Sequence, residues 1–119
     1  MIGKVRKRIK DGIADEKNRQ AALDLIDSFL STDDSNKRRR ISDELFLYEK
    51  KCMPENPVKC DVLIMSVGMQ KEPVILSIIS TRPKRVFLLH TDASRTTAEI
   101  VMSDPDITLM DVEFKAVEI

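Results

Sequence analysis

The stretch Asp61–Thr91, DVLIMSVGMQKEPVILSIISTRPKRVFLLHT, decides the fold that this sequence predicts. It opens with a continuous apolar run that ends at Gly68, and it closes with a second apolar run. Continuous rather than alternating hydrophobicity is typical of a strand that is covered on both faces, as in a parallel sheet. The stretch therefore predicts a buried strand, a glycine-containing turn, a helix, a short turn and a second buried strand.

Proline residues mark both ends of the helix between these strands. Glu72 and Pro73 open it, because proline fits the first turn of a helix, where its missing N–H is not needed. Arg82 and Pro83 end it, because the residue before a proline avoids the α region. The helix is rich in β-branched residues, so we expect burial to hold it.

A second helix and a third strand extend the pattern toward the C-terminus. A turn at residues 91–94 precedes a helix at residues 95–103, which the sequence Asp-Pro-Asp then breaks. Residues 107–117 predict a third strand, and its partial alternation indicates a sheet edge with one wetter face. The expected fold class is α/β: a small parallel three-stranded Rossmann-like half, in β-α-β-α-β order, preceded by an α-helical segment.

The order of these elements also predicts how the sheet is covered. Crossovers between parallel strands are right-handed, so both helices lie on the same face if the strands progress in one direction. The other face is then bare within this half of the chain. Amphipathic helices expected at residues 15–31 and 41–51, or a second subunit, are the candidates to cover it.

Residues 1–56 form a helical N-terminal segment in this interpretation, and residues 57–119 form the Rossmann-like segment. The helix at residues 15–31 has Asp15 as its N-cap. Its apolar stripe, at helical spacing, consists of Ala22, Leu25, Ile26, Phe29 and Leu30. After a polar break, a second helix is expected at residues 41–51.

Two short basic runs, at residues 1–10 and 37–40, stand out in the helical segment. Such runs are most often solvated faces, and the first would then be a frayed or helical arm. The alternative is that they contact nucleic-acid phosphate. A DNA-reading helix is disfavoured, because the helix at residues 41–51 carries several acidic side chains.

Composition narrows the class of protein. Lys+Arg and Asp+Glu are equal at 20 each, so no overall field draws the chain to nucleic acid or to a membrane. The charged N-terminus lacks the apolar segment of a signal peptide, and no apolar run approaches the length that spans a bilayer. We therefore expect a cytoplasmic protein whose Cys52 and Cys60 stay reduced. Together with His90, these cysteines fall short of a full zinc ligand set, so no metal is predicted.

The carboxyl ends of the first two strands are the candidate ligand site, because open α/β sheets bind their ligands there. Both turns precede helix N-termini, whose free N–H groups and positive dipole favour phosphate. Gly68 lets the backbone approach a ligand closely. The turns also offer hydroxyls, an amide, a cation and a carboxylate, from Ser66, Ser94, Gln70, Lys71 and Asp92. The alternative is structural: Gly68 only turns the chain, and Ser94 only caps its helix.

The residues themselves indicate neither a cofactor nor a catalytic group. The GxGxxG dinucleotide fingerprint and the Walker A loop are both absent. His90 is the only imidazole, and it either reaches the site or packs in the core, with packing slightly favoured.

The two turns and the segment between them resemble the CRISPR-associated Rossmann fold (CARF) family. The first carrier is residues 65–74, with Ser-x-Gly before a proline-started helix; residues 82–86 and 88–94 continue it. The match covers roughly residues 60–103 and keeps both turns and the intervening Pro-Lys-Arg in order.

The resemblance implies a sensor domain for cyclic oligoadenylate, the second messenger of type III CRISPR antiviral defence. Such domains act as dimers, with the ring lying across the two-fold axis. Transferred residue by residue, the ligand-binding positions are Ser66, Gly68, Met69, Gln70, Lys71, Thr91, Asp92 and Ser94. Some family members are metal-independent ring nucleases that cleave the ligand slowly, and Lys71 would then stabilise the pentavalent phosphate.

The sequence also departs from the family pattern. It supplies fewer strands than the family has, it begins with a helical segment, and it carries no HEPN-type nuclease motif. It would thus be a fragment, a minimal stand-alone sensor, or a half-domain that needs its dimer mate. The hypotheses that stay open are a sensor, a ring nuclease, and a small α/β interaction domain without a ligand.

Overall fold

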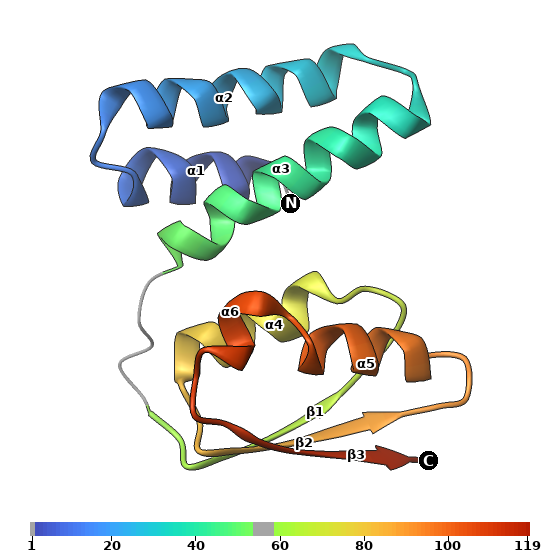
Figure 1. The fold of residues 1–119 in the computed structure, drawn as a ribbon. Helices are drawn as coiled ribbons and strands as arrows, with labels where there is room; N and C mark the ends of the chain where they lie inside the picture. The colour runs from blue at the N-terminus through green and yellow to red at the C-terminus, as the bar shows by residue number, and fades with distance from the viewer. Residues whose placement is uncertain (1, 54–58) are drawn as a thin grey trace. The chain divides into compact units, whose positions relative to one another are not determined.

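The computed structural model of the chain describes residues 2–53 and 59–119. The chain divides into two compact units, Met1–Pro54 and Glu55–Ile119 (Figure 1). The predicted boundary between the two segments, at residues 56 and 57, lies outside the described residues. Within the described ranges, every helix is too short or too polar to cross a membrane.

Three helices make up the described part of the first unit: α1 (Ile2–Gly12), α2 (Glu16–Ser31) and α3 (Ser35–Cys52). Their apolar faces meet in one core, whose buried members are Ile9, Ala22, Ile26, Leu45 and Cys52. Ile9 is fully buried, so α1 is an integral part of this core and not a frayed arm.

Aspartate caps fix the starts of α2 and α3. Asp15 is the N-cap of α2, as predicted, and its carboxylate accepts a hydrogen bond from the backbone N–H of Asn18 at 3.2 Å. Asp34 caps α3 in the same way, accepting from two N–H groups of the first turn. The expected start of this helix at residue 41 was therefore wrong. The basic run at residues 37–40 lies within α3, because Lys and Arg are good helix formers.

The second unit is a parallel sheet with its helices on one face (Figure 1). The sheet has three strands in the order β1-β2-β3, and both neighbouring pairs are parallel. Its elements are, in chain order, β1 (Val62–Ser66), α4 (Glu72–Thr81), β2 (Arg85–His90), α5 (Arg95–Met102), α6 (Pro105–Thr108) and β3 (Glu113–Glu118). The predicted α/β class, a three-stranded parallel Rossmann-like half preceded by helices, is confirmed.

The third strand is shorter than predicted, because a helix takes its first part. The carboxylate of Asp104 accepts backbone N–H groups at 3.0 and 3.3 Å and so starts α6. Ile107, expected in the strand, instead points into the core and is 1% exposed. β3 begins only at Glu113, and the expected start at residue 107 was wrong.

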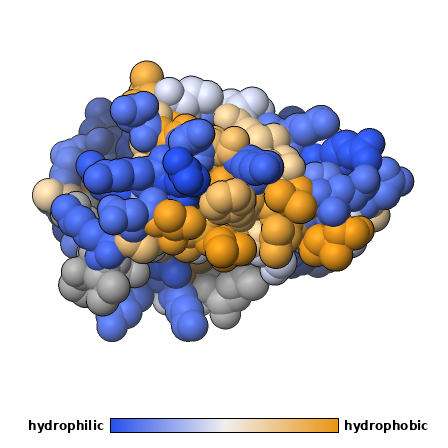
Figure 2. Space-filling view, turned by 90° about the horizontal axis from the view of Figure 1, so that it is seen from below, coloured by the Kyte–Doolittle hydropathy of each residue, from blue (hydrophilic) through white to orange (hydrophobic). Residues whose placement is uncertain are grey.

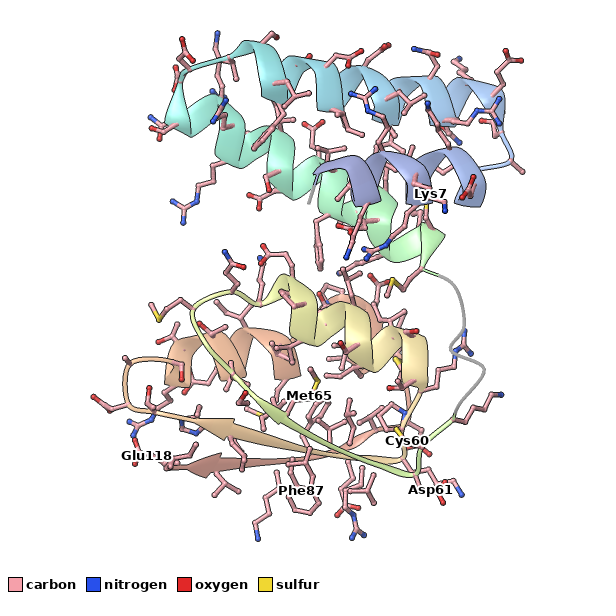
Figure 3. The ribbon with its side chains drawn as sticks, turned by 180° about the vertical axis from the view of Figure 1, so that it is seen from behind. Lys7, Cys60, Asp61, Met65, Phe87 and Glu118 are labelled. Carbon is pink, nitrogen blue, oxygen red and sulfur yellow. The ribbon has the colours of Figure 1, made fainter. Side chains whose placement is uncertain are left out.

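Strand register determines which side chains share each face of the sheet. Val86 and Leu88 of β2 are 0% exposed beneath the helices, and Met65 lies on that same side (Figure 3). Phe87 points the other way, as Figure 3 also shows. We call this second side the open face; its strand residues are Val62, Ile64, Ser66, Arg85, Phe87, Leu89, Glu113, Lys115 and Val117.

The open face contradicts one expectation. The continuous apolar run of β1 predicted cover on both sides, but Ile64 is 64% exposed and Val62 is 49% exposed. Both helices that follow β1 and β2 lie on the same side, as the crossover rule predicts. Within the described part of this unit, no helix covers the open face (Figure 1).

Candidate functional site

The carboxyl ends of all three strands lie at one edge of the sheet, because the strands are parallel. Ser66 ends β1 beside Leu89 of β2, and the N–H of Val67 donates to the carbonyl of Leu89 at 2.8 Å. At the end of β3, Glu118 pairs with His90. The structure therefore brings the two predicted turns together at one edge, with the end of β3 next to the second.

The first turn presents its predicted ligand-binding residues to solvent. Ser66, Gly68, Met69 and Gln70 are exposed, and Met69 reaches 75%. Lys71 is half-buried at the N-cap position of α4, where its side chain makes no capping bond. Among the described residues, no carboxylate pairs with its ammonium group. A lone cation beside the free N–H groups of a helix N-terminus suits an anionic ligand.

Gly68 is not required by the fold of this turn. Its φ is not positive, so any residue could adopt its backbone conformation. A methyl group placed on its Cα would meet no atom within 4 Å. The space over Gly68 is therefore open, and a ligand could approach the backbone there.

The second turn uses two of the predicted ligand residues for its own structure. The hydroxyl of Ser94 accepts the N–H of Thr91 at 2.9 Å and lies 3.3 Å from the Thr91 hydroxyl. Ser94 is only 2% exposed, so it holds the turn closed instead of facing solvent. It occupies the N-cap position of α5, but its side chain makes no capping bond.

An ion-pair cluster at this edge was missed by the sequence analysis. The Nη2 atom of Arg95 lies 3.4 Å from Oδ1 of Asp92 and 2.5 Å from Oε1 of Glu118. The hydrogen bond to Glu118 raises the pKa of Arg95, and the charges of Glu118 and Asp92 raise it further. The predicted strand stopped at residue 117, one short of Glu118. Parallel strand order was the signal that could have placed this carboxylate at the ligand edge.

His90 packs beneath the second turn. It is 6% exposed, and its Nδ1 lies 2.9 Å from the carbonyl oxygen of Thr91. A carbonyl only accepts, so Nδ1 donates this bond and carries the proton. Packing was the favoured interpretation of this residue, and its burial agrees. In the part of the chain that the structure describes, no cluster of His, Cys, Asp or Glu could hold a metal ion.

Two open hollows that the sequence did not indicate lie on the described residues of the helical unit. The larger has a volume of about 530 Å³ and lies between the start of α2 and the end of α3. The smaller, of about 400 Å³, is lined by Lys4, Lys7, Arg8, Asp11, Gly12 and Cys52. Arg8 is ion-paired with Glu49 of α3, so one of these cations is already neutralised.

Cys52 and Arg38, which belongs to the second basic run, have ordinary structural roles. Burial raises the pKa of the Cys52 thiol and the Glu49 carboxylate raises it further, which is the opposite of activation. Cys52 and Cys60 are both free. Arg38 donates to the carbonyl of Thr32 at 2.7 Å, with its guanidinium 5.0 Å from the centre of the Phe29 ring. This arginine therefore ties the α2–α3 turn together.

Comparison with known proteins gives no family for this chain. No protein-family model matches it, and no curated protein matches it in sequence. The CARF resemblance stays a hypothesis that depends on the two turns at the carboxyl edge of the sheet.

Proposed function

We propose that this chain is a CARF-like sensor that binds cyclic oligoadenylate, as a homodimer, in cytoplasmic type III CRISPR antiviral defence. The observation that carries the proposal is the first turn. It combines the N-terminus of α4, the open backbone at Gly68 and the ammonium group of Lys71, which pairs with no carboxylate among the described residues. These are the features that a phosphate group needs: free N–H donors, a positive charge and close access.

Different residues of the two turns would contact different groups of the ligand. Lys71 and the first N–H groups of α4 would bind phosphate, and the exposed hydroxyl of Ser66 would add a donor. Asp92 opposes phosphate by its charge, so its place is at a ribose hydroxyl, with Arg95 holding the carboxylate. Ser94 and Thr91 would shape the second turn from within.

Two copies of the site suit a ring-shaped ligand. A cyclic oligoadenylate with an even number of units repeats the same phosphate and ribose groups about its centre. Two identical first turns, related by a two-fold axis, would therefore meet equivalent groups on opposite sides of the ring. This is the reason for including the homodimer in the proposal.

A thermal shift experiment with cyclic tetra-adenylate and cyclic hexa-adenylate tests the proposal. A ligand that binds only the native state raises the melting temperature, so we expect a rise with one of the two rings. Gly68→Ala should melt like the wild type without ligand, because its Cβ meets nothing within 4 Å, yet lose the ligand-induced rise. Gly3→Ala is the matched control: its Cβ also meets nothing, and it lies outside the site.

Lys71→Ala separates the sensor from the ring nuclease. Loss of one charge-assisted hydrogen bond should weaken binding roughly 10- to 100-fold. Chromatography of the ligand after incubation distinguishes the two functions. Intact rings support a sensor, and linear products support a ring nuclease. In a nuclease, Lys71→Ala should lower turnover more than binding. If neither ring shifts the melting temperature of a folded protein, the proposal is wrong.

A further inference from the structure

We propose that the open face of the sheet is the contact surface for a second copy of this chain. The face gathers apolar side chains from all three strands. Ile64 and Val62 of β1 are 64% and 49% exposed, and Phe87, Leu89 and Val117 are only partly covered. Figure 2 looks onto this side of the molecule and shows hydrophobic side chains gathered across it. A patch of this kind on a monomer marks an interaction surface.

Ile119 extends the apolar surface past the end of β3. Its N–H donates to the carbonyl of His90 at 2.8 Å, which continues the ladder beyond Glu118. Side chains alternate along a strand, so Ile119 follows Val117 on the open side. It is 78% exposed.

The chain's own helices are poor candidates to cover this face. Ala22 and Ile26 of α2 and Leu45 and Cys52 of α3 are buried in the core of the helical unit. Phe46 of α3 is also buried, at 7% exposure, so it offers no free apolar surface. The large apolar side chains that these two helices leave exposed are Leu30 and Leu47, one from each. Single exposed leucines are normal on a surface and do not make a second apolar stripe.

The charged residues of the open face are compatible with a contact between two copies of that face. Arg85 is already neutralised by Glu113, with Nε and Oε2 3.3 Å apart, which leaves Lys115 as the remaining charge. Ile64, Phe87 and Lys115 form one row across the strands.

The position of Lys115 selects one arrangement of the two copies. A two-fold axis along the strands places Phe87 over its equivalent and Lys115 over Ile64, where its aliphatic stem packs and its ammonium group reaches solvent. The same axis brings Arg85 over its equivalent, and the Glu113 carboxylate paired with it in each copy offsets that repulsion. An axis across the strands would instead stack Lys115 on Lys115, and like charges facing each other are destabilising. The first arrangement is therefore the one that we infer.

The size of the face predicts a weak dimer. Strands spaced about 4.8 Å apart, with a rise of about 3.3 Å per residue, give a footprint of roughly 14 Å by 18 Å for each copy. The two footprints together cover roughly 500 Å², which is below the range of standard specific interfaces. We therefore expect a weak dimer that dissociates in the high micromolar range.

The inferred arrangement also has a consequence for ligand binding, and this part rests on the proposed function. With the axis along the strands, both sheets point the same way, so their carboxyl edges lie at the same end of the dimer. The first turns of both copies would then flank the axis at that end. Dimer formation itself needs no ligand.

Sedimentation of the full chain without ligand, over about 1 to 300 µM, tests the contact. We expect the mass to rise from 13.6 kDa toward twice that value as concentration increases. Ile64→Glu should raise the dissociation constant at least about 100-fold, because it buries a carboxylate in the contact of each copy. Leu109→Glu is the matched control, since Leu109 is 87% exposed at the C-cap of α6 on the helix layer. It should dimerise like the wild type.

Three results would overturn the inference. The wild type could stay monomeric over the whole range, or Ile64→Glu could dimerise as strongly as the control. Ile64→Glu could also lower the melting temperature of a monomeric protein by several degrees, which would mean that the chain itself covers this face. A dimer without any thermal shift from the two rings would leave this contact standing and refute only the ligand.

Discussion

The two faces of the sheet come from the same strands, yet their side chains have different surroundings. On the helix side, Val86 and Leu88 are 0% exposed, and Ile75 and Ile78 of α4 are fully buried in the same unit. On the open side, Ile64 of the neighbouring strand is 64% exposed. The strands are thus apolar on both sides, but the crossovers bring helices to only one. A strand that is apolar on both sides indicates that both faces of the sheet must be buried. The strand sequence does not identify the element that buries each face.

The largest expected effect is the difference in stability loss between alanine substitutions on the two faces of the sheet. Leu88→Ala removes a fully buried side chain, and we expect a loss of about 2–5 kcal/mol in the free energy of unfolding. Ile64→Ala removes an exposed side chain, so the loss in dilute protein should stay within about 0.5 kcal/mol. Urea denaturation at low micromolar concentration measures both.

Equal losses at these two positions would break the comparison. They would mean that Ile64 is buried in solution by another part of the same chain. A loss at Ile64 that grows with protein concentration would instead support a contact between copies, because dimerisation stabilises the native state by mass action.

The helical unit offers the same contrast between packed and open positions at two glycines. A methyl group on Gly12 would lie 2.7 Å from Cβ of Cys52, so α1 and α3 approach closely only because this residue has no side chain. Gly12→Ala should therefore cost about 1–3 kcal/mol through overpacking. Gly3→Ala, in open space on the same helix, should be neutral or slightly stabilising. Thermal melting of the two variants checks this, and equal melting temperatures would refute the close contact at Gly12.

Local signals in the sequence were sufficient for much of the fold. β1, α4, β2 and α5 lie where apolar runs and proline positions predicted them, because each of these signals acts on its own segment. The third strand was predicted too early, since an apolar run at residues 107–110 does not distinguish a strand from a short buried helix. The carboxylate of Asp104, which starts α6, decided between them.

Less of the candidate site than of the fold could be predicted from the sequence. Gly68 and Lys71 follow directly from the order strand, turn, helix, and both lie at the predicted edge. Arg95 and Glu118 were missed because their ion pair joins residues far apart in the sequence, and it appears only once β3 is placed beside β2. The inward hydroxyl of Ser94 depends on the detailed geometry of one turn, which residue type alone does not determine.

The smallest expected effect on stability is from breaking the Arg85–Glu113 ion pair on the open face. Arg85 and Glu113 have side chains that are 53% and 72% exposed, so water and salt screen their attraction. Glu113→Gln should change the free energy of unfolding by no more than about 0.5 kcal/mol in dilute protein. Urea denaturation at low and high salt measures this, with Lys115→Gln as a control on the same strand that leaves the Arg85–Glu113 pair intact. The contrary outcome is a loss above about 1 kcal/mol that persists in high salt and at low protein concentration. It would mean that the ion pair is shielded from water. The face could then no longer be regarded as open within one chain.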